Sequence, residues 1–320
     1  MMNGYRIAVL DDYTGAAEAS ADWSVLAPAE VQFFRDHLNE QSSLIQRLLP
    51  FDVVVIERER TPFPRMLLEA LPRLQLLVAT GPVNWSIDFD AAHQRRITVC
   101  GTEARQDLAP ELTIGLMLAL ARRIVMEDRS VRDGRWISGV GTSLRGKTLG
   151  IVGLGRIGRM VADLARPFGM HLQAWSANLT PEAAASASVK GVSREELLTS
   201  SDVVTLHVVL SERTRGLIDA SALALMKRSA FLINTSRGPL VDEAALINAL
   251  QLGRIAGAAL DVFENEPLMP EHPLLALDNV VLTPHIGYLT DEQCRLFYGQ
   301  VVENILAFRA GHPIRLLGPP

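Results

Sequence analysis

The stretch TLGIVGLGRIG, residues 148–158, passes from an apolar run into three glycines with the spacing GxGxxG, namely Gly153, Gly155 and Gly158. Between a strand and a helix, such glycines permit a tight turn, close approach of a pyrophosphate to bare backbone, and close packing of helix on strand. The spacing alone also occurs in ordinary glycine-rich turns. Its position between an apolar run and a helical stretch favours dinucleotide binding.

Outward from this loop, helical and apolar stretches alternate, as is typical of a parallel sheet with helices on both faces. After the loop we expect helices over 156–168, 194–200 and 242–253, and strands over 171–175, 202–208, 230–234, 256–262 and 279–283. Before it we expect strands over 6–10, 51–56, 74–79 and 97–100. A long apolar helix over 107–126 should pack between domains or subunits, and an amphipathic helix should cover 291–311. The pattern predicts an α/β protein with two doubly wound parallel-sheet domains, the second a Rossmann dinucleotide-binding domain.

Length and composition narrow the class of protein. A chain of 320 residues with 48% hydrophobic residues can fill two cores, and a net charge of -5 offers no basic surface for nucleic acid. Cys100 and Cys294 lie too far apart, and too far from histidine partners, to suggest a disulfide framework or a metal site. The N-terminus lacks a signal peptide, and the longest apolar run, 112–121, is too short to span a bilayer. We therefore expect a soluble, cytoplasmic protein without nucleic-acid or membrane partners.

The cofactor preference depends on the end of the strand that follows the glycine loop. There Ser176 replaces the acidic residue that binds the ribose 2′-hydroxyl of NAD in many dinucleotide domains. Nothing at Ser176 repels a 2′-phosphate, yet the nearest basic residues in sequence are Arg166 and Lys190. We expect NAD as the cofactor, with NADP not excluded. Arg156, inside the loop, is either a phosphate ligand or a solvated surface arginine.

Polar residues follow several predicted strands. Arg237, Glu266 and His285 each lie just beyond a strand, and Asp261 lies at the end of one. The carboxyl ends of parallel strands are where doubly wound sheets bind ligands. An arginine, a carboxylate and a histidine there could anchor a carboxylate, orient a proton donor and donate the proton. Taken one at a time, Arg237 could be a surface cation, Glu266 a loop carboxylate and His285 a core histidine.

Five segments occur in a fixed order: LRGKTLGIVGLGRIGRMVA, SDVVTLHVVLSERTRGLI, FLINTSRGPLVDEAALINAL, AGAALDVFENEP and TPHIGYLT. In order and spacing they resemble the D-isomer-specific 2-hydroxyacid dehydrogenase family, which includes glyoxylate and hydroxypyruvate reductases. The resemblance implies that Arg237 holds the substrate, that His285 is the general acid/base, and that Glu266 orients and charges His285. The residues expected to contact the cofactor are Gly153, Gly155, Arg156, Ile157, Gly158, Ser176, Thr235, Asp261, which would lie near the nicotinamide carboxamide, and Gly287.

The resemblance also implies how the chain is divided. Residues 1–103 and 291–320 would form the substrate domain, and 104–290 the NAD(P)-binding Rossmann domain, through which two copies would form a homodimer. The family's substrate loop offers two successive backbone N–H groups, but the matching stretch here, TGPVN, contains Pro82, which has none. We expect Gly81 and Val83 to supply the donors instead, unless the carboxylate binds differently.

These features predict an oxidoreductase that transfers a hydride between a nicotinamide cofactor and a small 2-oxo acid or D-2-hydroxy acid. Glyoxylate, hydroxypyruvate and pyruvate are the expected substrates. Two alternatives stay open at this point. One is an NAD-binding scaffold of the corepressor kind, which can keep the same three residues, and the other is a dehydrogenase of the formate or phosphite type.

Overall fold

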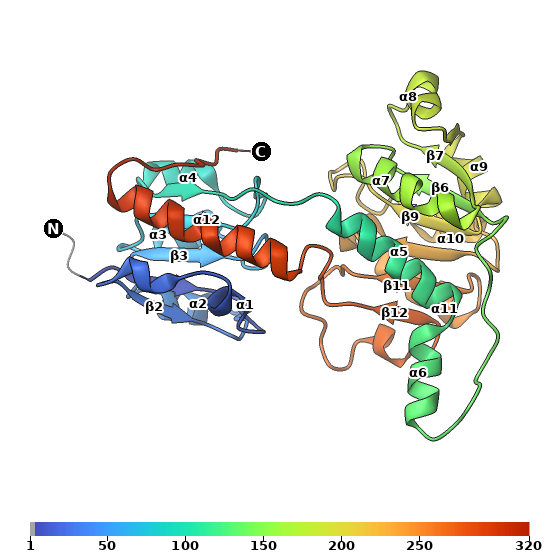
Figure 1. Ribbon diagram of the computed structural model, residues 1–320, viewed down its shortest axis with the longest axis horizontal. Helices are drawn as coiled ribbons and strands as arrows, with labels where there is room; N and C mark the ends of the chain where they lie inside the picture. The colour runs from blue at the N-terminus through green and yellow to red at the C-terminus, as the bar shows by residue number, and fades with distance from the viewer. Residues whose placement is uncertain (1–3, 320) are drawn as a thin grey trace. The chain divides into compact units, whose positions relative to one another are not determined.

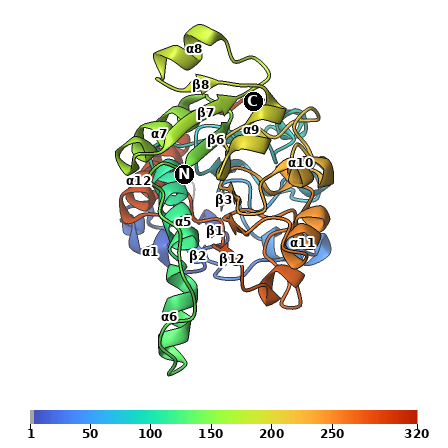
Figure 2. The same cartoon turned by 90° about the vertical axis from the view of Figure 1, so that its right-hand side faces the viewer.

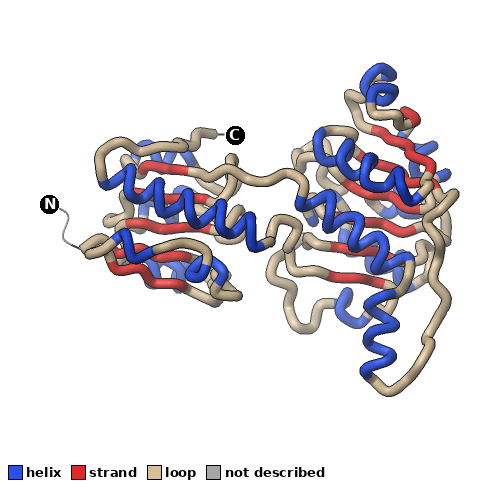
Figure 3. Tube along the Cα trace, in the orientation of Figure 1, coloured by secondary structure: helices blue, strands red, loops and turns tan. Residues whose placement is uncertain are grey.

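The computed structural model describes residues 4–319, which fold into two compact units. The first unit contains the residues up to Arg105 and those from Leu289 onward, and the second unit is Gln106–Tyr288. Each unit is a parallel sheet covered by helices (Figures 1 and 3). The prediction of two doubly wound α/β domains is therefore confirmed.

In the described part of the first unit, five parallel strands have the order β2-β1-β3-β4-β5. This order reverses direction between β1 and β3, which is the switch point of a doubly wound sheet. The strands are β1 (Arg6–Val9), β2 (Glu30–Phe33), β3 (Val53–Ile56), β4 (Leu76–Ala79) and β5 (Thr98–Cys100). The helices are α1 (Ala16–Ala19), α2 (Gln41–Leu48), α3 (Arg65–Glu69), α4 (Phe89–Gln94) and α12 (Asp291–Arg309).

In the second unit, all of which is described, seven parallel strands have the order β12-β11-β10-β9-β6-β7-β8. Counted from β6, this is the Rossmann order 3-2-1-4-5-6 with one more strand at the β12 edge. The strands are β6 (Thr148–Val152), β7 (His171–Trp175), β8 (Lys190–Gly191), β9 (Val203–Leu206), β10 (Phe231–Asn234), β11 (Gly257–Leu260) and β12 (Val280–Leu282). The helices are α5 (Leu108–Ala121), α6 (Ile124–Arg132), α7 (Arg156–Ala165), α8 (Pro181–Ser186), α9 (Arg194–Ser200), α10 (Ala220–Leu225) and α11 (Glu243–Gln251).

Strand alternation fills both faces of the second sheet. Leu232 and Ala258 pack with α9, α10 and α11, whereas their chain neighbours Ile233 and Ala259 pack with α5 and α7. Figure 2 shows these two helix layers on opposite sides of the strands. Because successive side chains of a strand point to opposite faces, strands buried on both sides read as continuous apolar runs. Helices therefore cover both faces of the sheet, and the polar loops lie at the carboxyl ends of its strands.

The predicted helix over 107–126 is wrong in its extent. α5 ends at Ala121, Arg123 has a left-handed backbone with φ of 55°, and α6 begins at Ile124. The break has a local cause, because the N–H of Thr142 donates to the Ala121 carbonyl at 2.7 Å, an acceptor that a continuing helix would need. The buried side chains of α5 face the second sheet and α7, so this helix belongs to the core of its own unit.

Several short elements were not predicted from the sequence, among them β2, β8, α8 and α10. β2 is an edge strand whose residues alternate between exposed and half-buried, so it lacks the apolar run that marks the central strands. The final helix was predicted over 291–311 and spans Asp291–Arg309. In the described range 4–319, no helix is long and apolar enough to cross a membrane.

Candidate active site

The glycine loop between β6 and α7 leaves no room for side chains at two of its three glycines. Gly153 has φ of 98°, and a Cβ there would collide with the carbonyl oxygen of His207. A Cβ on Gly158 would collide with the carbonyl oxygen of Gly153. A Cβ on Gly155 would meet nothing within 4 Å. The loop therefore has a tight turn, an open backbone and a close helix contact in the order that a dinucleotide cradle requires.

Gly155 is the N-cap of α7 and leaves open space in front of the helix N-terminus. Backbone N–H groups and the helix dipole at such an end favour an anion, so the chain's own residues fit a pyrophosphate. The Arg156 side chain, which the sequence left as either a phosphate ligand or a surface residue, contacts the side-chain oxygen of Gln106. Ile157 is half-buried against the α5 and α7 core.

Ser176 follows β7 directly beside the glycine loop. The carbonyl of its neighbour Trp175 accepts the Gly153 N–H at 2.8 Å, which ties the end of β7 to the loop. Ser176 itself is half-buried, and its carbonyl accepts the N–H of Leu179 at 3.1 Å. The structure thus places Ser176 at the strand end where a ribose-binding acid would stand.

His285 contacts Glu266, and this contact joins the two predicted catalytic side chains. His285 Nδ1 lies 2.7 Å from Glu266 Oε2, and the other oxygen, Oε1, accepts the N–H of Phe263 at 2.9 Å. An ionised carboxylate only accepts hydrogen bonds, so Nδ1 carries the proton in this pair. The other ring nitrogen, Nε2, is then the atom that can exchange a proton with a ligand.

Asp261 holds the turn that carries His285. Its carboxylate accepts the Thr283 hydroxyl at 2.6 Å, the Ile286 N–H at 2.8 Å and the Gly287 N–H at 2.9 Å. His285 has φ of 55°, a conformation that a non-glycine residue adopts only when its surroundings impose it. Burial raises the pKa of Asp261, and the hydrogen bonds from the turn oppose that shift. Gly287 fits because a larger residue would press on the same carboxylate.

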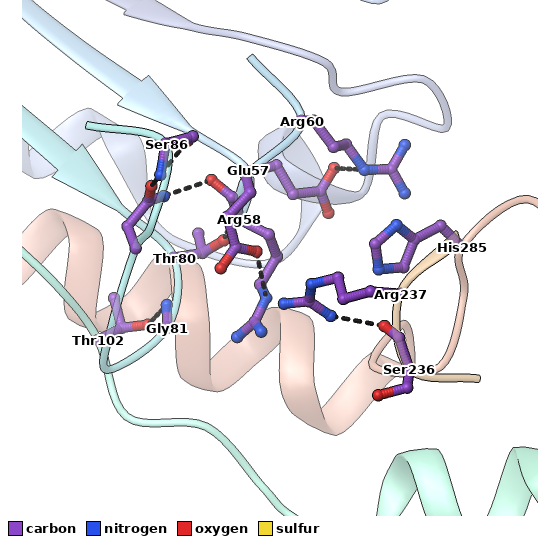
Figure 4. Close-up of polar contacts among 12 residues, drawn as sticks. Glu57, Arg58, Arg60, Thr80, Gly81, Ser86, Thr102, Ser236, Arg237 and His285 are labelled. Atoms are coloured by element: carbon purple, nitrogen blue, oxygen red, sulfur yellow. Dashed lines mark hydrogen bonds and ion pairs between the residues drawn. The ribbon is translucent and has the colours of Figure 1, made fainter. Parts of the chain in front are cut away.

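Arg237 lies in the loop after β10, and the side chain of Asn234 holds this loop in place through two hydrogen bonds. The Asn234 side chain donates to the Arg237 carbonyl at 2.9 Å and accepts the Ser236 N–H at 3.1 Å. The Arg237 guanidinium donates to the Ser236 carbonyl at 2.8 Å (Figure 4). The next residue, Gly238, has no space for a Cβ because the Phe263 carbonyl lies against it. The Arg237 loop and the Glu266 loop are therefore packed backbone to backbone.

Thr235 pairs with a residue that sequence reasoning missed. Its hydroxyl lies 2.7 Å from that of Thr113 on α5, and the Thr113 hydroxyl also donates to the Ala109 carbonyl at 2.8 Å. A hydroxyl has one proton, so Thr113 can only accept from Thr235 while it donates to Ala109. Thr235 then offers lone pairs, and not a proton, to a ligand. No periodicity in the sequence connects Thr113 to Thr235.

A second histidine, His207, also lies just beyond a strand end. It follows β9, and its Nε2 lies 2.9 Å from the Thr205 hydroxyl. Desolvation lowers the pKa of His207 to about 3, so its ring stays neutral near pH 7. A neutral ring held by a hydroxyl is a poor proton donor, which separates His207 from the carboxylate-paired His285.

The predicted substrate loop belongs to the first unit and follows β4. The Gly81 N–H donates to the Thr102 hydroxyl at 2.7 Å, and the Gly81 carbonyl accepts the Thr102 N–H at 2.9 Å (Figure 4). The Gly81 N–H is thus used inside the unit, and Pro82 has no N–H. Of the two expected donors, Val83 is the one whose N–H could be offered to a ligand.

Within the described residues, no group of three His, Cys, Asp or Glu side chains is arranged to hold a metal ion. The site described above contains backbone N–H groups, the Arg237 guanidinium and the imidazole of His285 paired with Glu266. Such groups bind anions and move protons, and they contain no redox centre of their own. A redox reaction here would need a bound cofactor, for which the glycine loop provides the place.

Comparison with known proteins agrees with this geometry. Residues 114–287 match the model of the D-isomer specific 2-hydroxyacid dehydrogenase, NAD binding domain. The chain is 39% identical to a D-3-phosphoglycerate dehydrogenase of Archaeoglobus fulgidus over 279 residues, covering 86% of the chain but 53% of that relative. It is also 39% identical to a glyoxylate reductase of Korarchaeum cryptofilum, over 82% of the chain and 84% of the relative.

A solved structure is similar over almost the whole chain. The crystal structure of a putative D-3-phosphoglycerate dehydrogenase from Ralstonia solanacearum superposes with a TM-score of 0.92 at 35% identity, covering 97% of this chain and 96% of that one. The matched NAD binding domain falls within the second unit and contains the glycine loop, Arg237, Glu266 and His285. The chain belongs to the D-isomer specific 2-hydroxyacid dehydrogenase family, and its second unit is the family's NAD binding domain.

Proposed function

We propose that this protein is an NAD-dependent reductase of a small 2-oxo acid and forms the D-2-hydroxy acid. When bound, the reduced nicotinamide supplies a hydride to the carbonyl carbon. His285 gives the Nε2 proton to the carbonyl oxygen, and the reverse reaction returns that proton to Nε2. Arg237 binds the substrate carboxylate and stabilises the negative charge that develops on the carbonyl oxygen.

The observation that carries the proposal is the 2.7 Å contact between His285 Nδ1 and Glu266 Oε2. A carboxylate that accepts from Nδ1 orients the ring and leaves Nε2 as the nitrogen that can exchange a proton with a ligand. Residues of the same unit hold both loops in place. Asp261 accepts hydrogen bonds from the turn that carries His285, and Asn234 donates to the Arg237 carbonyl. Carbonyl reduction requires a proton donor and an anion-binding group that the protein holds in fixed positions.

The substrate is proposed from chemistry because the relatives differ. One relative is named for phosphoglycerate and another for glyoxylate, at the same identity to this chain. We propose glyoxylate, hydroxypyruvate and pyruvate as the substrates. The test is a panel of 2-oxo acids assayed with NADH and with NADPH. We expect turnover of at least one small 2-oxo acid, whereas no turnover by protein shown to bind NADH would favour an NAD-binding scaffold.

Cofactor discrimination should be modest because Ser176 has a hydroxyl where an acid would repel a 2′-phosphate. Ser176→Asp is expected to raise the NADH to NADPH ratio of kcat/KM by about tenfold or more, through repulsion of the 2′-phosphate. Ser176→Asn is the matched control, since it adds bulk without charge. If the ratio is unchanged in Ser176→Asp, the ribose does not bind beside Ser176.

The second unit exposes a group of large apolar side chains on α6 and the loop after it. The members are Ile124, Val125, Val131, Trp136, Ile137 and Val140. Trp136 is 77% exposed and Val140 is 93% exposed, which is costly for side chains that meet only water. We propose that this surface is covered by a second copy in a homodimer. Light scattering of the wild type should give a mass of twice the 35.0 kDa of one chain. Ile137→Asp should lower the measured mass toward that of a single chain. A monomeric wild type at micromolar concentration would refute the dimer.

A further inference from the structure

The segment from Phe263 to His272 carries Glu266, yet few apolar contacts hold it. Between these ends only Leu268 packs on the core, while Asn265, Pro267 and Met269 are exposed. A segment with few buried apolar contacts is held in place mainly by its polar contacts. Polar contacts with residues outside the segment would therefore help to hold Glu266 against His285.

One carboxylate contacts the segment near both of its ends. Glu243 lies in the first turn of α11, and its Oε2 accepts the N–H of Glu264 at 3.3 Å. Its Oε1 lies 3.0 Å from His272 Nε2. The two side chains are 17% and 18% exposed, so water competes only weakly for this pair. α11 is itself fixed by the Asp242 side chain, which accepts the Ala245 N–H at 2.9 Å.

The hydrogen bonds of His272 define its tautomer. Nδ1 accepts the N–H of Leu274 at 3.4 Å, as the cap of the following turn. Nδ1 is then unprotonated, and Nε2 carries the proton that Glu243 accepts. Leu274 is fully buried, so this contact ties His272 to the core as well as to Glu243.

We propose that Glu243 and His272 are positioning residues that fix the Glu266 segment and so keep Glu266 on His285. We call this pair the Glu243 clamp. The catalytic part of this inference rests on the proposed function. The clamp touches neither the glycine loop nor His285, so its effect reaches the reaction only through Glu266.

The clamp predicts a specific kinetic pattern. Glu243→Ala should lower kcat by about tenfold. This is the lower end of the loss that follows when a residue that orients a metal-binding side chain is removed. The KM for NADH should stay within about twofold, because the cofactor cradle is separate. Glu243→Gln keeps one oxygen acceptor and should be intermediate, and His272→Ala should resemble Glu243→Ala. Glu195→Gln, an exposed acid in the first turn of α9, is the matched control for the helix dipole and should have no effect.

A double-mutant cycle decides whether the effect acts through Glu266. In a Glu266→Gln background, Glu243→Ala should lower kcat by less than about twofold, because there is no charged partner left to position. An undiminished tenfold loss in that background would overturn the proposal and assign Glu243 a general structural role.

Hydrogen exchange tests the clamp without any assay of turnover. Glu243→Ala should speed amide exchange over 263–272 by about tenfold while leaving 153–160 unchanged. Unchanged exchange over 263–272 would overturn the clamp whatever the kinetics. If the wild type turns over no 2-oxo acid and exchange nevertheless rises as expected, the proposed function fails while the clamp stands as the support of the Glu266 segment.

Discussion

His285→Ala is expected to lower kcat for 2-oxo acid reduction by about 10²- to 10⁴-fold, the usual contribution of a positioned general acid. The reverse oxidation should fall by a similar factor, since the same Nε2 must then accept the proton. The affinity for NADH should be preserved, because the glycine loop does not involve His285. Steady-state kinetics in both directions and a fluorescence titration of NADH would measure all three quantities.

The control for this change is His171→Ala, which removes an exposed histidine at the start of β7 in the same unit. It should leave kcat within about twofold of the wild type. Near-normal turnover by His285→Ala would show that another group supplies the proton, and the assignment of His285 would be wrong. Loss of NADH binding together with activity would instead indicate that the substitution damages the fold of the unit.

Arg237→Lys is expected to lower kcat/KM by about 10²-fold, although it conserves the charge. One guanidinium N–H donates to the Ser236 carbonyl at 2.8 Å, and the planar, forked group can bind a carboxylate through two N–H groups. Lysine has a single ammonium group that cannot serve both partners in that geometry. The loss should appear in kcat as well as in KM, because charge on the carbonyl oxygen grows during the reaction.

Arg254→Lys supplies the comparison, since Arg254 is an exposed arginine of the same unit. It should behave as the wild type. A change in Arg237→Lys confined to a several-fold rise in KM would mean that Arg237 only attracts the substrate. The proposed role in stabilising the developing charge would then be withdrawn.

Local patterns in the sequence predicted the parts of the site that lie next to strands. The glycine loop follows β6, and His285 follows β12, so each could be placed from an apolar run and the residues after it. Parallel strands then bring their carboxyl ends to one edge, which accounts for the grouping of residues far apart in sequence. The division of the second sheet into two buried faces follows in the same way from alternation.

Contacts between distant segments could not be predicted from the sequence. The clamp joins the start of α11 to a turn 29 residues later, and Thr113 meets Thr235 across 122 residues. The end of α5 is set by the N–H of Thr142, and the Gly81 N–H is used by Thr102. Each contact depends on tertiary packing, to which neither helical nor strand periodicity is sensitive.

The most direct test of the central claim is to follow the hydride. Wild-type protein should be given NADH that carries deuterium at both C4 positions, together with a substrate whose product is chiral at C2, such as pyruvate or hydroxypyruvate. The product is then examined for configuration and label. The account predicts a D-2-hydroxy acid that carries deuterium at C2. An L-hydroxy acid, a product without deuterium at C2, or no product from protein that binds NADH would contradict it.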